Sequence, residues 1–233
     1  MLDHIQLLVF DLDYLIFDCA LLKVRALRQS LISFADTIPQ DIRLPDAMDA
    51  EEGYLMHGFR WTQFLDIGLD EERLAEFQPV YRINEDRLLE AGAGQIYPGV
   101  LDELANLRSN KLMLALGAEA SREYLLSVSD RYDFAALFDI ALCTQEFGVG
   151  GTDEMLEEIM RQCEVNRSET VVLGTRPTFF EAAHNLNAMA VGCGWGIHHH
   201  GGLGNADLQS LTLSTLVPAI HKADELSTQS IDY

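Results

Sequence analysis

The stretch Leu8-Val9-Phe10-Asp11-Leu12-Asp13 (LVFDLD) is the most informative part of the sequence for the fold. It continues an apolar run, Gln6–Phe10, of the kind that forms a buried parallel strand. Because side chains alternate along an extended chain, Asp11 and Asp13 share one face just past this strand. Two acids so placed suit a nucleophile or metal ligand beside a general acid/base. The alternative is that an aspartate after a strand caps a helix, but Asp18 shortly afterwards favours a site.

Four further apolar runs predict parallel strands, with helical periodicity between and after them. The predicted strands are Lys111–Leu116, Ile140–Cys143, Thr170–Leu173 and Ala188–Gly192. The predicted helices are Val100–Arg108, Arg122–Tyr132, Asp153–Cys163, Phe179–Asn187 and a last helix near Leu211–Ala223. This alternation indicates an α/β fold with a doubly wound sheet, whose ligands lie at the carboxyl ends of the strands.

The long segment between the first strand and Tyr97 has helical texture. Leu21–Ala35 is amphipathic, Gly53–Leu65 is rich in aromatic residues, and Asp70–Leu89 predicts another helix. We therefore expect a helical insert that covers the carboxyl edge of the sheet. The predicted organisation is a core of residues 1–17 and 95–223, a cap of residues 18–94, and a flexible tail of residues 224–233.

The opening run, continued by Leu15-Ile16-Phe17-Asp18, resembles the motif FDLDGTLVDS of the haloacid dehalogenase (HAD) superfamily. Tyr97-Pro98-Gly99-Val100 resembles the YPGV that returns the chain from cap to core in phosphoglycolate-phosphatase-like members. Residues 192–196 (GCGWG) resemble their late GVxWG. The resemblance covers roughly residues 5–200. It implies a three-layer Rossmann-like core with an α-helical C1 cap, Asp11 as nucleophile and Asp13 as the acid/base for the leaving group.

The family's other catalytic positions carry different residues in this chain. They are Tyr14 for a glycine beside the substrate, Gly117 for the phosphate-binding Thr or Ser, Val149 for the charge-balancing lysine, and Thr175 and Phe179 for the metal-binding acids. We expect Tyr14, Gly117 and Ala118 to border the substrate position. Only Asp11 and Asp13 remain as metal ligands. Since Mg²⁺ needs near-octahedral oxygen ligation anchored by carboxylates, we expect weak Mg²⁺ binding at best and no other cofactor.

Two functional hypotheses follow from these departures. The first is a binding or regulatory pseudoenzyme without ordinary Mg²⁺-dependent phosphatase activity, because losing even one electrostatic stabiliser costs about 10²–10³ in rate. The second is an atypical HAD hydrolase acting on a small phosphorylated or acidic metabolite. There Arg176 replaces the lost cations as an anion clamp, with Arg60 or Lys23 adding charge. The other interpretation of Arg176 is a solvated loop residue.

The composition limits the partners. The formal net charge of −21 argues against nucleic acid and anionic membranes, so we expect a small-molecule ligand or a protein partner, and a monomer or homodimer. No signal peptide or membrane span is predicted, and four scattered cysteines suit free thiols in the cytoplasm. Residues 198–200 (HHH) predict a surface loop rather than a metal site.

Overall fold

The computed structural model describes residue 2 and residues 4–34, 46, 69, 71–148, 151–197 and 201–229. The chain divides into two compact units, one made of residues 1–17 with 96–233 and the other of residues 18–95. The described part contains no helix long and apolar enough to cross a bilayer.

A six-stranded parallel sheet forms the centre of the first unit, in the order β5-β4-β1-β6-β7-β8. Its strands are β1 (Leu7–Asp11), β4 (Met113–Ala118), β5 (Ile140–Cys143), β6 (Thr170–Gly174), β7 (Met189–Cys193) and β8 (Leu208–Ser210). All five predicted strands are confirmed. The edge strand β8 is additional, because three residues without an apolar run leave no strand signal.

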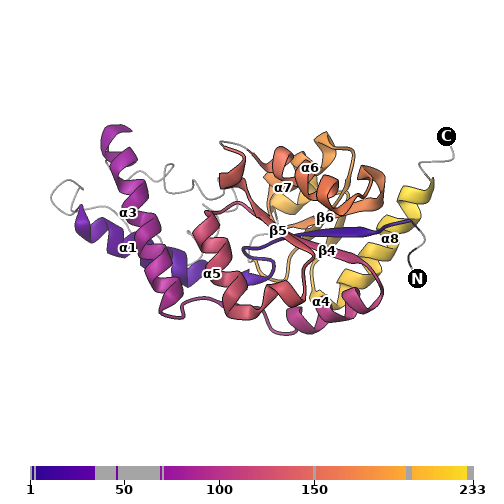
Figure 1. Ribbon diagram of the computed structural model, residues 1–233, viewed down its shortest axis with the longest axis horizontal. Helices are drawn as coiled ribbons and strands as arrows, with labels where there is room; N and C mark the ends of the chain where they lie inside the picture. The colour runs from indigo at the N-terminus through magenta and orange to yellow at the C-terminus, as the bar shows by residue number, and fades with distance from the viewer. Residues whose placement is uncertain are drawn as a thin grey trace. The chain divides into compact units, whose positions relative to one another are not determined.

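Helices cover both faces of the sheet (Figure 1). They are α4 (Val100–Ser109), α5 (Arg122–Tyr132), α6 (Thr152–Cys163), α7 (Pro177–Asn185) and α8 (Leu216–Gln229), with short 3-10 turns at 134–136, 144–146, 167–169, 201–205 and 213–215. The α6 and α7 helices pack on one face, and α4, α5 and α8 on the other. The prediction of a three-layer, Rossmann-like α/β core is confirmed.

The central position of β1 explains its apolar sequence. Residues Leu7, Leu8 and Val9 are fully buried because helices cover both of their faces. The strand lies between β4 and β6, so both of its edges are also paired. Its carboxyl end, Asp11, is thereby held at the middle of the sheet edge.

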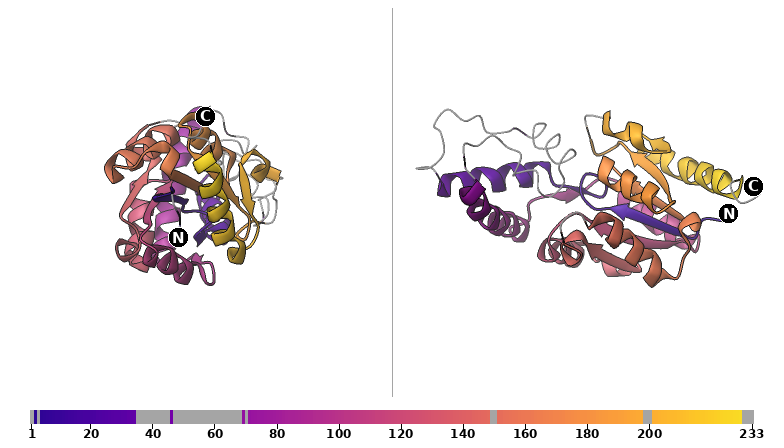
Figure 2. Two further views of the ribbon diagram at one scale, coloured as in Figure 1. Left: turned by 90° about the vertical axis from the view of Figure 1, so that its right-hand side faces the viewer. Right: turned by 90° about the horizontal axis from the view of Figure 1, so that it is seen from above.

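The predicted flexible tail from Asp224 onward is wrong in its starting point. Helix α8 continues to Gln229, and Ala223 and Ser227 are buried. The Asp224 carboxylate accepts hydrogen bonds from the backbone N–H of His4 at 2.8 Å and of Ile5 at 2.6 Å. These two hydrogen bonds join helix α8 to the segment just before β1, and the two lie side by side (Figure 2).

The second unit contains α1 (Ala20–Ser33) and α3 (Glu71–Glu90), which pack on each other. A two-stranded sheet of β2 (Phe17–Asp18) and β3 (Gln95–Ile96) forms where the chain passes between the units. Both predicted helices are present here. The aromatic stretch 53–65 lies outside the described residues.

Candidate active site

The acids Asp11 and Asp13 lie at the carboxyl edge of the sheet. Asp11 ends β1 and pairs in register with Gly117 of β4. Both residues are buried, with exposures of 0% and 2%. The turn after β1 is tight, since the carbonyl of Leu12 accepts a hydrogen bond from the N–H of Ile16. The turn therefore keeps Asp13 beside the strand end.

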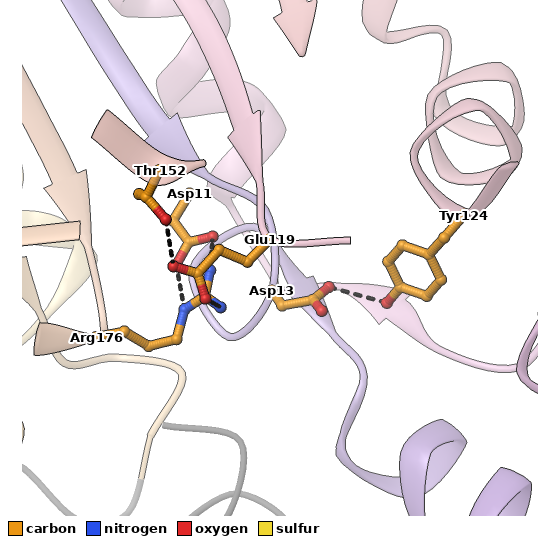
Figure 3. Close-up of polar contacts among 6 residues, drawn as sticks. All are labelled: Asp11, Asp13, Glu119, Tyr124, Thr152 and Arg176. Carbon is orange, nitrogen blue, oxygen red and sulfur yellow. Dashed lines mark hydrogen bonds and ion pairs between the residues drawn. The ribbon is translucent and has the colours of Figure 1, made fainter. Parts of the chain in front are cut away.

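Arg176 binds the Asp11 carboxylate from the neighbouring strand. Strand β6 ends at Gly174, and Pro177 begins α7, a position that suits a residue without an N–H. Arg176 stands between them, fully buried. Its Nε donates to Oδ2 of Asp11 at 2.9 Å and its Nη2 to Oδ1 at 2.5 Å (Figure 3). This bidentate geometry is the strongest form of an arginine–carboxylate pair.

A second carboxylate, Glu119, completes the surroundings of the guanidinium group. The Nη1 atom of Arg176 donates to Oε2 of Glu119 at 2.8 Å, and the Thr152 hydroxyl donates to Oε1 at 3.0 Å (Figure 3). The Phe179 ring centroid lies 5.1 Å from the guanidinium carbon, within cation–π range. The solvated-loop interpretation of Arg176 is therefore wrong. It clamps anions, but these anions are the chain's own carboxylates.

The single positive charge of Arg176 cannot neutralise the negative charges of both Asp11 and Glu119. Burial raises the pKa of Asp11 to about 7, while Arg176 acts in the opposite direction and Glu119 and Asp13 raise it further. Burial prevails because the single cation is shared between Asp11 and Glu119. Burial and the Asp11 charge also raise the pKa of the Cys193 thiol. The Asp11 carboxyl group therefore holds its proton to a higher pH than an exposed aspartate does.

The Asp13 carboxylate has its own donor. The Tyr124 hydroxyl, from α5, donates to Oδ1 of Asp13 at 2.8 Å (Figure 3). Tyr124 is fully buried and makes an edge contact with Phe17, at 6.3 Å between ring centroids. Helix α5 begins at Ser121, whose side chain accepts from the Tyr124 N–H, as a helix-start residue should. The hydrogen bond of the Ser121 side chain thus stabilises the first turn of α5, which carries the Tyr124 hydroxyl donor.

Tyr14, where the family has glycine, is part of the core. It is fully buried and has a φ of 61°, a left-handed conformation that favours glycine. The loop at Gly196 lies directly against it: a Cβ added there would come within 1.9 Å of the Tyr14 carbonyl oxygen. The Trp195 indole N–H donates to the Leu15 carbonyl at 2.9 Å. These contacts hold the turn that carries Asp13.

The predicted phosphate-binding position at Gly117 is filled by apolar side chains. A Cβ added to Gly117 would lie 2.9 Å from the terminal methyl of Met155 and 3.5 Å from the Phe179 ring. Ala118 ends β4 and is buried. A threonine would not fit at Gly117 without movement of Met155.

The residues at this edge do not fit Mg²⁺. Both Asp11 oxygens accept hydrogen bonds from Arg176, and a fixed cation already occupies their coordinating side. The expected acidic positions hold Thr175, whose buried hydroxyl has no hydrogen-bond partner among the described residues, and the apolar Phe179. Within the described ranges, no group of three or more His, Cys, Asp or Glu could hold a metal ion.

Of the other predicted cations, Lys23 is paired within its own unit and Arg60 lies outside the described residues. The Lys23 ammonium group pairs with Glu85 of its own unit at 3.2 Å. Arg60, Val149 and residues 198–200 are outside the described residues. Sequence reasoning missed Glu119, although an acid directly after a buried strand run was the available signal.

The comparisons with known proteins agree with this architecture. A family model described as haloacid dehalogenase-like hydrolase matches residues 8–193, well over half of the chain. The chain therefore belongs to the haloacid dehalogenase-like hydrolase family.

Individual relatives are more distant. The chain is 25% identical to the "Probable phosphatase IndB" of Dickeya dadantii (strain 3937), over 97% of this chain and 98% of that protein. A predicted phosphoglycolate phosphatase from Haemophilus somnus 129PT superposes with a TM-score of 0.77 at 14% identity, covering 94% of this chain and 99% of the other. A predicted phosphatase from Clostridium acetobutylicum gives 0.75 at 17%, covering 99% and 100%. These structures share the fold.

Proposed function

We propose that this HAD-family protein lacks ordinary Mg²⁺-dependent phosphatase activity and works as a binding or regulatory protein. The observation that carries the proposal is the buried, bidentate pairing of Arg176 with Asp11. An aspartyl nucleophile needs an accessible oxygen lone pair directed at the phosphorus atom. Here both oxygens accept from Arg176, and the residue is fully buried.

The charge balance supports the same proposal. Phosphoryl transfer depends on cations that stabilise charge on the transferring group. The positive charge of Arg176 is already paired with the carboxylates of Asp11 and Glu119. A phosphate dianion would meet two buried carboxylates beside one committed cation. Loss of one electrostatic stabiliser costs about 10²–10³ in rate, and here the lysine, the metal acids and the threonine are all replaced.

An atypical hydrolase is the second candidate, favoured by the intact Asp11/Asp13 pair and by the similarity to the Dickeya protein, which is named a probable phosphatase. In this case Arg176 would release Asp11 and bind the anionic group of a small phosphorylated or acidic substrate. Asp11 would attack, and Asp13, oriented by Tyr124, would protonate the leaving group. This requires the ion pair to open.

The proposal extends to the helical unit, the partners and the location of the protein. The helical unit of residues 18–95 would act as a C1 cap, and the ligand would be a small molecule or a protein partner. The strongly negative charge supports a protein that binds neither nucleic acid nor membrane, and the free cysteines support a cytoplasmic location. A monomer or homodimer suits such a protein.

A crystal structure at high concentrations of Mg²⁺ and inorganic phosphate tests the main proposal. We expect Arg176 to remain on Asp11, with Met155 and Phe179 beside Gly117 and no metal at the strand edge. Mg²⁺ coordinated by the Asp11 carboxylate, with Arg176 displaced, would overturn the proposal. Phosphate bound to Arg176 without Mg²⁺ would favour the atypical hydrolase instead.

A further inference from the structure

A cavity lies at the amino end of the sheet, the end opposite to Asp11. Its volume is about 300 Å³, at the lower limit of small-molecule sites. It is bordered by the segments that begin β1 and β4 and by helices α4 and α8, which lie on the same face of the sheet (Figure 1). All of these elements belong to the first unit.

The lining of this cavity is amphipathic. Apolar side chains, among them Ile5, Leu107, Leu112 and Ile220, form somewhat more than half of the lining, and the polar side chains are Gln6, Asn106, Asn110, Lys111 and His221. Apolar walls with a few polar groups are typical of small-molecule sites, because the walls give affinity and the polar groups give orientation. The cavity therefore suits a compound with an apolar body and one polar head.

The charge around the cavity differs from that of the whole chain. The protein has 37 acidic and 16 basic residues, yet the described residues that line the cavity include Lys111 and His221 and no carboxylate. The Lys111 ammonium group forms no ion pair within the described residues and is exposed. A cation at the mouth of an apolar cavity favours a negatively charged head.

The backbone at Lys111 supports a role for its side chain. Lys111 has a φ of 66° in the turn between α4 and β4, where glycine would be unstrained. Its N–H donates to the Arg108 carbonyl at 3.0 Å, which fixes the turn. This turn therefore fixes the backbone position from which the exposed Lys111 side chain extends.

Carboxylates just behind the lining are hydrogen-bonded to neutral groups of the chain. Asp224 accepts from two backbone N–H groups. Glu169 accepts from the Gln6 amide at 2.7 Å, and Glu103 from the Asn106 amide at 3.3 Å. These carboxylates keep their charge, but none of them lines the cavity, where Lys111 is the permanently charged side chain.

We propose that this cavity binds a small monoanion with an apolar body, such as an alkyl carboxylate. The head group pairs with Lys111 at the mouth and the body packs between α4 and α8. The inference is independent of the catalytic state of Asp11, since the two sites lie at opposite ends of the sheet.

Isothermal titration calorimetry with three probes of equal chain length, namely octanoate, octan-1-ol and octylammonium, tests this site. We expect one octanoate per chain, with octan-1-ol weaker and octylammonium weakest. Non-specific attraction to a chain of charge −21 would give the opposite order for the two ions. That reversed order, or no saturable binding of octanoate, would overturn the proposal.

Three variants locate the binding. Lys111→Gln should weaken octanoate by about threefold to tenfold, as for an exposed charge-assisted contact, and leave octan-1-ol unchanged. Arg25→Gln makes the same charge change on an exposed residue of α1 and should alter neither. Val217→Trp, at a half-buried lining position, should abolish binding of both. Unchanged octanoate binding in Lys111→Gln or in Val217→Trp, with circular dichroism confirming the fold, would refute the assignment.

Discussion

The guanidinium group of Arg176 donates to both carboxylate oxygens of Asp11, residues separated by 165 positions in the chain. Asp11, to which the resemblance assigns the role of nucleophile, is thereby part of an internal ion pair. Three strand ends contribute to it, because Asp11 ends β1, Arg176 follows β6 and Glu119 follows β4. We expect this ion pair to stabilise the folded state and to prevent the Asp11 carboxylate from acting as a nucleophile.

Removing the arginine should destabilise the protein strongly. Arg176→Met leaves Asp11 and Glu119 buried without their cation, and breaking one side of a buried pair costs about 3–5 kcal/mol. Urea unfolding measures this loss. The matched control is Arg161→Met, which removes an exposed pair with Glu158 and should cost at most about 1 kcal/mol.

A double-mutant cycle separates the ion pair from packing. Adding Asp11→Asn to Arg176→Met removes one uncompensated charge, so the double variant should lose less stability than the two single losses combined. Additive losses would contradict a direct interaction between the two side chains.

The stability should depend on pH through Asp11. Its folded pKa, about 7, lies above the ordinary value of 3.8, so the folded state binds more protons than the unfolded state between these values. The free energy of unfolding should therefore fall as pH rises from about 4 to 7, by on the order of a few kcal/mol. Asp11→Asn removes this titration. Urea unfolding at several pH values compares the slopes, and parallel curves for the two proteins would refute the raised pKa.

The hydrogen bond from Tyr124 to Asp13 should contribute measurably to stability. Tyr124→Phe removes the donor from a buried carboxylate, at a cost of about 1–3 kcal/mol. Tyr132→Phe makes the same change at the end of the same helix, where no hydrogen bond of the hydroxyl to a described residue is present, and should be nearly neutral. Equal melting temperatures for the two variants would show that the Tyr124 hydroxyl contributes nothing.

The close approach of Gly196 to the Tyr14 turn should make that glycine irreplaceable. In Gly196→Ala the added methyl would meet the Tyr14 carbonyl oxygen at 1.9 Å and the Tyr97 ring at 2.8 Å. We expect a loss of roughly 1–3 kcal/mol or more. Gly204→Ala is the control, since nothing lies within 4 Å of its added carbon. Thermal unfolding compares them, and a tolerated Gly196→Ala would contradict the packing.

Sequence patterns predict the core of this fold well because buried parallel strands are continuously apolar. The strand Ile140–Cys143 and the helix Arg122–Tyr132 are confirmed at both ends. The end of α8 is not predicted, since the side chain that anchors it, Asp224, bonds to the backbone 220 residues away. Such a contact leaves no periodic signal.

The sequence predicts where the candidate site lies but not which of its side chains pair with one another. The resemblance to the HAD opening motif points to Asp11 and Asp13, and the same resemblance places Thr175 and Phe179 where it implies metal-binding acids. The partner of Arg176 depends on which strand ends are adjacent and on where the side chain points. Sequence spacing determines neither, so neither interpretation of Arg176, as an anion clamp for a ligand or as a solvated loop residue, includes its pairing with Asp11.

Phosphatase turnover shows most directly whether Arg176 prevents Asp11 from acting as a nucleophile. It is measured on the whole chain, with and without millimolar Mg²⁺, using p-nitrophenyl phosphate and a panel of sugar phosphates. Asp11→Asn is measured beside it. We predict that the wild-type protein and Asp11→Asn give the same background rate in both conditions, because Arg176 already occupies the Asp11 carboxylate. Mg²⁺-stimulated turnover that disappears in Asp11→Asn would show that Asp11 acts as a nucleophile despite its pairing with Arg176.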